Sequence, residues 1–153
     1  MGNIFRPTRG NSRCRTWFAP YPVTGYGAGM RFSQDSFATN SIRAYRDGEI
    51  LVNDQTIARS VVITPDSIQD WDPCSVDELT QQHFTQLGAL QPEIVILGTG
   101  SRLSFPAPQF SIQLQAQGIG MEIMATDAAC RTFNVLLAED RRVIAALIIA
   151  RAV

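Results

Sequence analysis

The residues best suited to chemistry form a glycine-rich turn after a run of apolar residues. The stretch EIVILGTG, residues 93–100, is an apolar run that ends in this turn. Five residues of the turn and of the two positions after it could hold an anion: Gly98, Thr99, Gly100, Ser101 and Arg102. A glycine-rich turn between a buried strand and a helix can cradle the phosphates of a dinucleotide, and the full fingerprint has a third glycine. Leu103 occupies that position, and Pro106 and Pro108 follow it, so no helix continues directly from the turn. The phosphate-binding motif is therefore incomplete.

A second candidate group lies near the start of a helix that the pattern predicts over 128–139. It contains a thiol, a cation and an amide: Cys130, Arg131 and Asn134. A cysteine in a first helical turn beside an arginine can be a reactive thiolate, whereas its spacing with Phe133 and Leu137 is typical of a buried cysteine. A cation in the first turn opposes the helix dipole, so Arg131 needs a partner, either Asp127 or an anion outside the chain.

The two groups would lie close together if the strands before them were neighbours. Ligands of open α/β sheets bind beyond the carboxyl ends of parallel strands, where backbone N–H groups and two arginines could form one anion-sized pocket. In the alternative interpretation, the glycines only allow a strand to turn sharply against a packed helix. The sequence leaves both interpretations open, and neither assigns a catalytic residue.

The other reactive residue types do not form a complete catalytic or metal-binding set. His83 is the single histidine and falls on or beside an apolar helical stripe, which predicts a packed residue rather than a general base. The three cysteines, Cys14, Cys74 and Cys130, lack CxxC spacing, which argues against a zinc site. We therefore predict neither a metal nor another cofactor.

Composition and charge favour one domain and argue against several classes of partner. The chain has 153 residues, of which 45% are hydrophobic and 18% are charged, enough for one buried core. From the first acid, Asp35, onward, 8 arginines stand against 14 acidic residues, a net charge of −6. This balance disfavours nucleic acid as a partner, and no apolar run is long enough to span a bilayer. We predict a bacterial cytoplasmic location, or a mitochondrial one in a eukaryote, and the oligomeric state stays open.

The first 29 residues differ from the rest of the chain. Residues 1–29 mix arginine, glycine, proline and serine without helical or strand periodicity. We interpret them as a disordered leader or as the product of a mis-assigned start, with translation beginning at Met30. Residues 30–153 then form a single α/β domain.

From residue 41 onward the pattern predicts strands and then alternating helices and strands. Two β-rich runs at 42–45 and 49–52 flank a hairpin turn, and 59–64 is a third strand. A capping box of Ser75 and Glu78 predicts a helix that ends at Leu87. The remaining elements are a strand at 93–97, a helix at 109–117, a strand at 121–125, a helix at 128–139 capped by Asp127, and a strand at 143–150. This order predicts an α/β fold with a central mixed sheet, N-terminal hairpin strands and parallel final strands.

Three stretches carry a resemblance to a known family: PEIVILGTG at 92–100, GIGMEIM at 118–124 and AACRTFNVLLAEDRRVIAALI at 128–148. The chain resembles a family of small α/β proteins of unknown biochemical activity, found as single domains in bacteria and archaea, which includes a mitochondrial assembly factor of respiratory complex I. The resemblance implies a three-layer fold with three main helices. It also implies a non-enzymatic binding or assembly module with a protein partner. A small-molecule enzyme or sensor for an anionic metabolite or nucleotide, using the GTG turn and the Cys130-Arg131 helix start, is the alternative.

Overall fold

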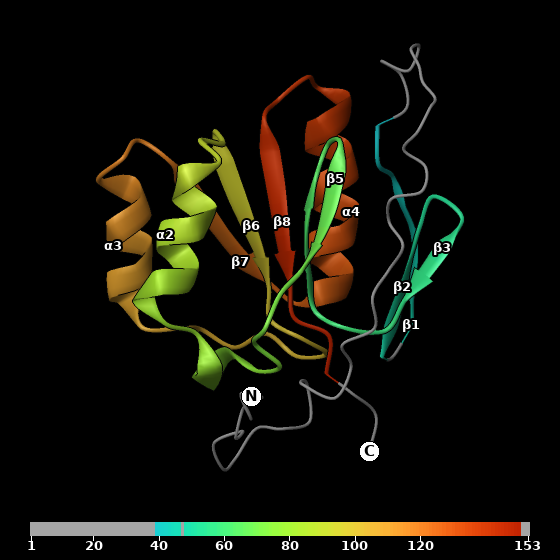
Figure 1. The fold of residues 1–153 in the computed structure, drawn as a ribbon, viewed down its shortest axis with the longest axis horizontal. Helices are drawn as coiled ribbons and strands as arrows, with labels where there is room; N and C mark the ends of the chain where they lie inside the picture. The colour runs from blue at the N-terminus through green and yellow to red at the C-terminus, as the bar shows by residue number, and fades with distance from the viewer. Residues whose placement is uncertain (1–38, 47, 151–153) are drawn as a thin grey trace, which may run out of the picture.

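The computed structural model describes residues 39–46 and 48–150 of the chain. The predicted leader over 1–29 and the domain boundary at residue 30 lie outside the described residues. The described residues form a three-layer α/β fold in which a central sheet is covered on both faces (Figure 1). No helix in this part of the chain is long and apolar enough to cross a membrane.

The central sheet has five strands in the order β5-β4-β8-β6-β7. They are β4 Val61–Thr64, β5 Ser67–Asp70, β6 Ile94–Gly98, β7 Gly120–Met124 and β8 Val143–Leu147. β6 runs parallel to β7 and β8, whereas β4 pairs antiparallel with β5 and β8. This confirms the predicted central mixed sheet with parallel final strands. The sequence pattern misses β5, because its residues SIQD are mostly polar and are half-buried or exposed.

The N-terminal strands form a separate three-stranded antiparallel sheet. Its strands are β1 Ile42–Arg46, β2 Glu49–Val52 and β3 Gln55–Ile57. The predicted hairpin is confirmed, and the strand predicted at 59–64 is present as β4, but it is not the third strand of this sheet. β3 takes that place in the small sheet, and β4 joins the central sheet. All four residues of β4 are buried, and only the central sheet offers a strand cover on both faces.

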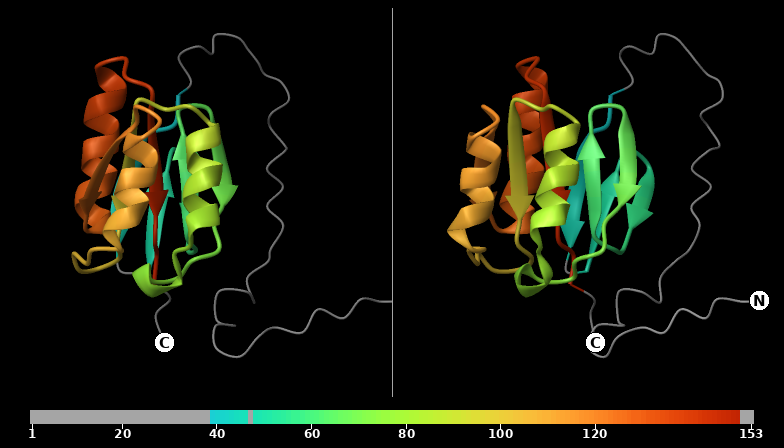
Figure 2. Two further views of the ribbon diagram at one scale, coloured as in Figure 1. Left: turned by 90° about the vertical axis from the view of Figure 1, so that its left-hand side faces the viewer. Right: turned by 60° about the vertical axis from the view of Figure 1, so that its left-hand side comes forward.

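Three helices within residues 39–46 and 48–150 complete the layers, as predicted. They are α2 Gln81–Ala89, α3 Pro108–Gln115 and α4 Thr126–Ala138. Figures 1 and 2 show α2 and α3 on one face of the central sheet and α4 on the other, with the small sheet beside α4. Two hydrophobic cores result, one on each face, because alternate residues of a strand point to opposite faces. In β6, for example, Val95 and Leu97 enter the α2–α3 core, whereas Ile96 enters the α4 core.

The start of α2 differs from the sequence prediction. Ser75 makes no side-chain cap, and only a short 3-10 turn, Val76–Glu78, follows it. The chain then becomes extended at Leu79, whose side chain is buried in the α2–α3 core. The helix begins after Thr80, which shares a reciprocal capping box with His83. Burial of an apolar side chain thus interrupts the helix that the local Ser75 and Glu78 pattern favours.

His83 lies at the boundary of the core, as predicted. Its Nδ1 accepts a hydrogen bond from the Thr80 backbone N–H at 3.0 Å, and its ring packs edge-on against Trp71 with ring centroids 5.7 Å apart. Burial lowers the pKa of His83, while Asp72 and Glu78 oppose this shift. The ring therefore acts as a helix cap at the edge of the core.

The start of α4 also differs by a small amount. The helix begins at Thr126 with Ala125 as its N-cap, so the predicted cap, Asp127, lies inside the first turn. Asp127 still accepts a hydrogen bond from the Ala128 backbone N–H at 2.7 Å. A carboxylate in this first turn is favoured by the helix dipole.

Candidate functional site

The GTG turn, residues Gly98 to Gly100, lies directly beside the start of α4. β6 and β7 are neighbouring parallel strands, and Gly98 pairs with Met124, the last residue of β7. The backbone N–H of Thr99 donates to Met124 O at 2.9 Å, and that of Thr126 donates to Gly100 O at 2.9 Å. The strands before the two candidate groups are therefore neighbours, which is the condition that the sequence analysis set for the two groups to lie close together.

The two glycines of the turn are required for different reasons, one steric and one conformational. A Cβ on Gly98 would lie 2.9 Å from Thr126 Oγ1, 3.0 Å from Leu147 Cδ2 and 3.1 Å from Thr126 Cα. Gly98 is thus required by the close approach of α4 and β8 to this end of β6. Gly100 has open space around it but adopts φ +108°, a left-handed conformation that favours glycine. Both features match the interpretation in which the glycines turn a strand sharply against a packed helix.

Thr126 is the hydrogen-bonding centre of this end of the sheet. Its side chain is fully buried. Its Oγ1 accepts from the Gly100 backbone N–H and donates to Ile148 O, both at 2.8 Å. One hydroxyl thereby ties the GTG turn, the start of α4 and the chain after β8 together.

Thr99 closes the other side of the turn. Its Oγ1 donates to Arg102 O at 2.7 Å and accepts from the Ser104 backbone N–H at 3.1 Å. The N–H groups of Thr99 and Gly100 already have partners within the protein. An anion at the turn would have to compete with these bonds, since an unpaired buried N–H group is costly.

The three candidate residues of α4 point in different directions. Cys130 is buried in the α4 core beside Ala129 and Phe133. Burial, aided by the Asp127 charge, raises the pKa of the Cys130 thiol to about 12, despite the opposing effect of Arg131. At neutral pH the group is a protonated thiol, and its surroundings are those of a packed apolar residue rather than of a nucleophile.

Arg131 faces solvent, and Asn134 faces the small sheet. Arg131 pairs with Asp127 at 3.8 Å, with 72% of the arginine side chain exposed. Asn134 bridges to β1: its Oδ1 accepts from Ile42 N at 3.0 Å and its Nδ2 donates to Ile42 O at 2.7 Å. The structure therefore brings the GTG turn to the helix start at Thr126, but it does not gather the predicted α4 side chains around one pocket with that turn.

The loop after the turn is exposed, and its apolar side chains are the feature that the sequence analysis missed. Ser101 and Arg102 are exposed. Leu103 is 52% exposed and Phe105 is 68% exposed, while Pro106 is buried. A large aromatic residue beside two prolines, outside any predicted element, was the signal available in the sequence.

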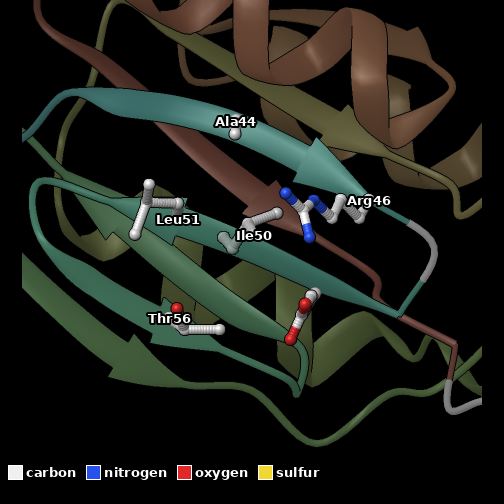
Figure 3. Close-up of a pocket in the computed structure, with 6 residues that line it drawn as sticks. Ala44, Arg46, Ile50, Leu51 and Thr56 are labelled. Atoms are coloured by element: carbon white, nitrogen blue, oxygen red, sulfur yellow. The ribbon is translucent and has the colours of Figure 1, made fainter.

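A shallow cavity of about 150 Å³ lies elsewhere, on the small sheet. It is lined by Ala44, Arg46, Glu49, Ile50, Leu51 and Thr56 (Figure 3). Leu51 is the cross-strand neighbour of both Ala44 and Thr56. None of the side chains predicted to bind a ligand contributes to this cavity.

The chain shares sequence with an assembly factor of a respiratory complex. It is 33% identical over 109 residues to the Bos taurus protein named NADH dehydrogenase (ubiquinone) 1 alpha subcomplex assembly factor 3. The match covers 70% of this chain and 59% of the bovine protein. The chain therefore matches less than two thirds of that relative's length.

Solved structures of bacterial proteins share the fold. A crystal structure of a Bordetella parapertussis protein is 36% identical, with a TM-score of 0.68, over 72% of this chain and 95% of that one. An NMR structure of a Xanthomonas campestris protein is 37% identical, with a TM-score of 0.67, over 72% of this chain and 85% of that one. Residues 42–148 match the family described as "Protein of unknown function (DUF498/DUF598)". From β1 to the end of β8, this three-layer α/β chain belongs to that family.

Proposed function

We propose that this chain is a non-enzymatic protein-binding module that assists the assembly of a respiratory complex. The observation that carries the proposal is the 33% identity to a relative named an assembly factor of NADH dehydrogenase. The relative's name implies work on other proteins rather than on a metabolite. The predicted cytoplasmic or mitochondrial location remains a prediction.

The geometry around the GTG turn agrees with a scaffold rather than a reaction centre. The polar atoms of Thr99 and Thr126 are engaged in hydrogen bonds that hold the turn together. Cys130 is a buried thiol with a raised pKa. These residues stabilise the end of the sheet, and the exposed side chains beside them remain available for contact with another protein.

The alternative, a small-molecule enzyme or sensor at the GTG turn and the Cys130-Arg131 helix start, has no observation in its favour. Its anion cradle requires the N–H groups of Thr99 and Gly100, which donate within the protein, and Arg131 is already paired with Asp127. A titration with a panel of nucleotides and phosphorylated metabolites, followed by amide NMR, separates the two functions. Joint shifts of residues 98–102 and 130–134 would favour the alternative.

Deletion of the gene in the organism that encodes it tests the proposed function. We expect subassemblies of NADH dehydrogenase to accumulate on native gels and the full-length chain to restore the mature complex. The matched control is Val135→Ser, which changes an exposed side chain on α4 and should also restore assembly. Normal amounts of the mature complex in the deletion strain would refute the proposal.

A further inference from the structure

We propose that residues 101–105, hereafter the exposed loop, form the docking surface for a partner protein that presents an apolar patch edged by a carboxylate. The inference rests on the proposed protein-binding function and names its surface and the chemistry of the partner. The exposed loop joins the GTG turn to α3 at the carboxyl end of β6. It contains two large apolar side chains and one cation, all of which face solvent.

The apolar part of the surface consists of Leu103 and Phe105. Among the described residues, Phe105 is the most exposed large apolar side chain at 68%, and Leu103 is exposed at 52%. A phenylalanine ring left in water loses the stabilisation that burial would provide. Aromatic residues are also enriched in the centres of protein interfaces. An exposed phenylalanine two residues after an exposed leucine therefore marks a contact for an apolar surface.

The backbone beneath these side chains is held in place. Thr99 Oγ1 bonds both to Arg102 O and to Ser104 N, so it fixes the loop on either side of Leu103. Pro106 is buried, and Pro108 begins α3. A surface that is already ordered loses less conformational entropy on binding than a flexible one. The hydrogen bonds of the GTG turn thus serve to present Leu103 and Phe105.

The charge next to the apolar pair selects the partner. Arg102 is exposed and has no ion pair with any carboxylate of residues 39–46 and 48–150, whereas Arg131 pairs with Asp127. A carboxylate on the partner would complement this arginine at the rim of the contact. Arg102 is the one cation of the exposed loop, and the chain from Asp35 onward has a net charge of −6. This charge is a poor match for a nucleic acid or an anionic membrane. The observations therefore favour a protein with an acidic residue next to apolar ones.

Selection of random displayed peptides on the purified full-length chain tests this surface. We expect the enriched peptides to combine several apolar residues with Asp or Glu. Phe105→Ser should weaken their binding by about tenfold or more, as at an interface hot spot. Arg102→Glu should weaken binding to acidic peptides and select basic ones instead. Val135→Ser, a change at another exposed apolar position, on α4, should leave binding unchanged.

Three results would overturn the proposal. The first is peptide binding that Phe105→Ser and Arg102→Glu leave unchanged, or enrichment of peptides without acidic residues. The second is self-association in sedimentation velocity that Phe105→Ser abolishes, because the occupant would then be a second copy of this chain. The third is flotation with phosphatidylserine vesicles that Phe105→Ser abolishes, because the loop would then contact a membrane.

The deletion strain separates this proposal from the proposed function. If the Phe105→Ser chain restores the mature complex as well as the unchanged chain does, the exposed loop is not the docking surface while the assembly function stands. If the deletion has no effect on the complex but the peptide results are as expected, the docking surface stands and the assembly function falls. Circular dichroism and thermal melts of each variant confirm that it is folded.

Discussion

The connection between β6 and α3 has two parts, the GTG turn and the exposed loop, which differ in the side chains that they bury. In the GTG turn, polar groups are turned inward and satisfy one another through Thr99 and Thr126. In the exposed loop, apolar side chains are turned outward at Leu103 and Phe105. Glycine and threonine here build the support, and the residues that we propose as a docking surface follow them in sequence. Substitutions that disturb the buried GTG turn should lower the free energy of unfolding, most of all at Thr126.

Removal of the Thr126 hydroxyl should destabilise the GTG turn more than any other change considered. Thr126→Val keeps the shape of the side chain but leaves Gly100 N and Ile148 O without their partner. We expect the free energy of unfolding to fall by about 3 kcal/mol, since each buried unpaired group costs about 1–3 kcal/mol. Thr126→Ser retains the hydroxyl and should lose less than half as much. Urea denaturation of the three proteins measures the difference, and equal losses for Val and Ser would contradict the role of the hydroxyl.

A methyl group at Gly98 should also destabilise the turn. Gly98→Ala places a Cβ within 3.1 Å of three atoms, including the Cα of Thr126, so the start of α4 has to move. We expect a loss of about 2 kcal/mol, as is usual for overpacking a buried site. Gly120→Ala is the matched control on the neighbouring strand, because its nearest atoms lie at 3.7 Å and 3.8 Å. Thermal melts that show equal shifts for both alanines would exclude the close-approach explanation.

The Cys130 thiol should be unreactive in the folded protein. Its pKa is raised to about 12 by burial, so at neutral pH iodoacetamide should modify it only after unfolding. Peptide mass spectrometry before and after denaturation measures this modification. Rapid alkylation of Cys130 in the native protein would show that α4 is more open than the structure indicates.

The same pKa shift predicts a pH dependence of stability. The native state holds the proton of Cys130 more tightly than the unfolded chain, whose thiol ionises near its ordinary pKa of about 8.5. This contribution to stability is complete below that pH and is lost as pH rises toward about 12. Unfolding free energies measured from neutral to alkaline pH should therefore decline more steeply for the wild type than for Cys130→Ala. Parallel profiles would show that the thiol does not contribute.

Arg131 should have the smallest effect. Its ion pair with Asp127 spans 3.8 Å and is largely exposed, so Arg131→Ala should lower the free energy of unfolding by at most about 0.5 kcal/mol. Denaturant melts of the variant and the wild type decide this point. A loss above about 2 kcal/mol would mean that Arg131 has a buried partner, as uncompensated buried charges are far more costly.

Most of the local elements, and the family, could be predicted from the sequence alone. Strand β6 was predictable because its apolar run has the length and continuity of a strand covered on both faces. The hairpin of β1 and β2 was predictable from its turn residues, and α4 from its apolar stripe at Cys130 and Phe133. These elements depend on residues that are close to one another in the chain. Their positions can therefore be predicted from the sequence.

What the candidate residues contact depends on the tertiary fold and could not be predicted from the sequence. Asn134 belongs to the predicted α4 group, yet its side chain bonds to Ile42, which is 92 residues away. The hydroxyl that completes the GTG turn comes from Thr126 across the sheet, and no local pattern marks it. Phe105 would be assigned to a core by its chemistry, yet its exposure follows from the hydrogen bonds and the buried proline that hold its loop outward. Hydrogen-bond partners and exposure depend on which elements pack together. Packing brings together residues that lie far apart in the chain, and no local sequence pattern predicts such contacts.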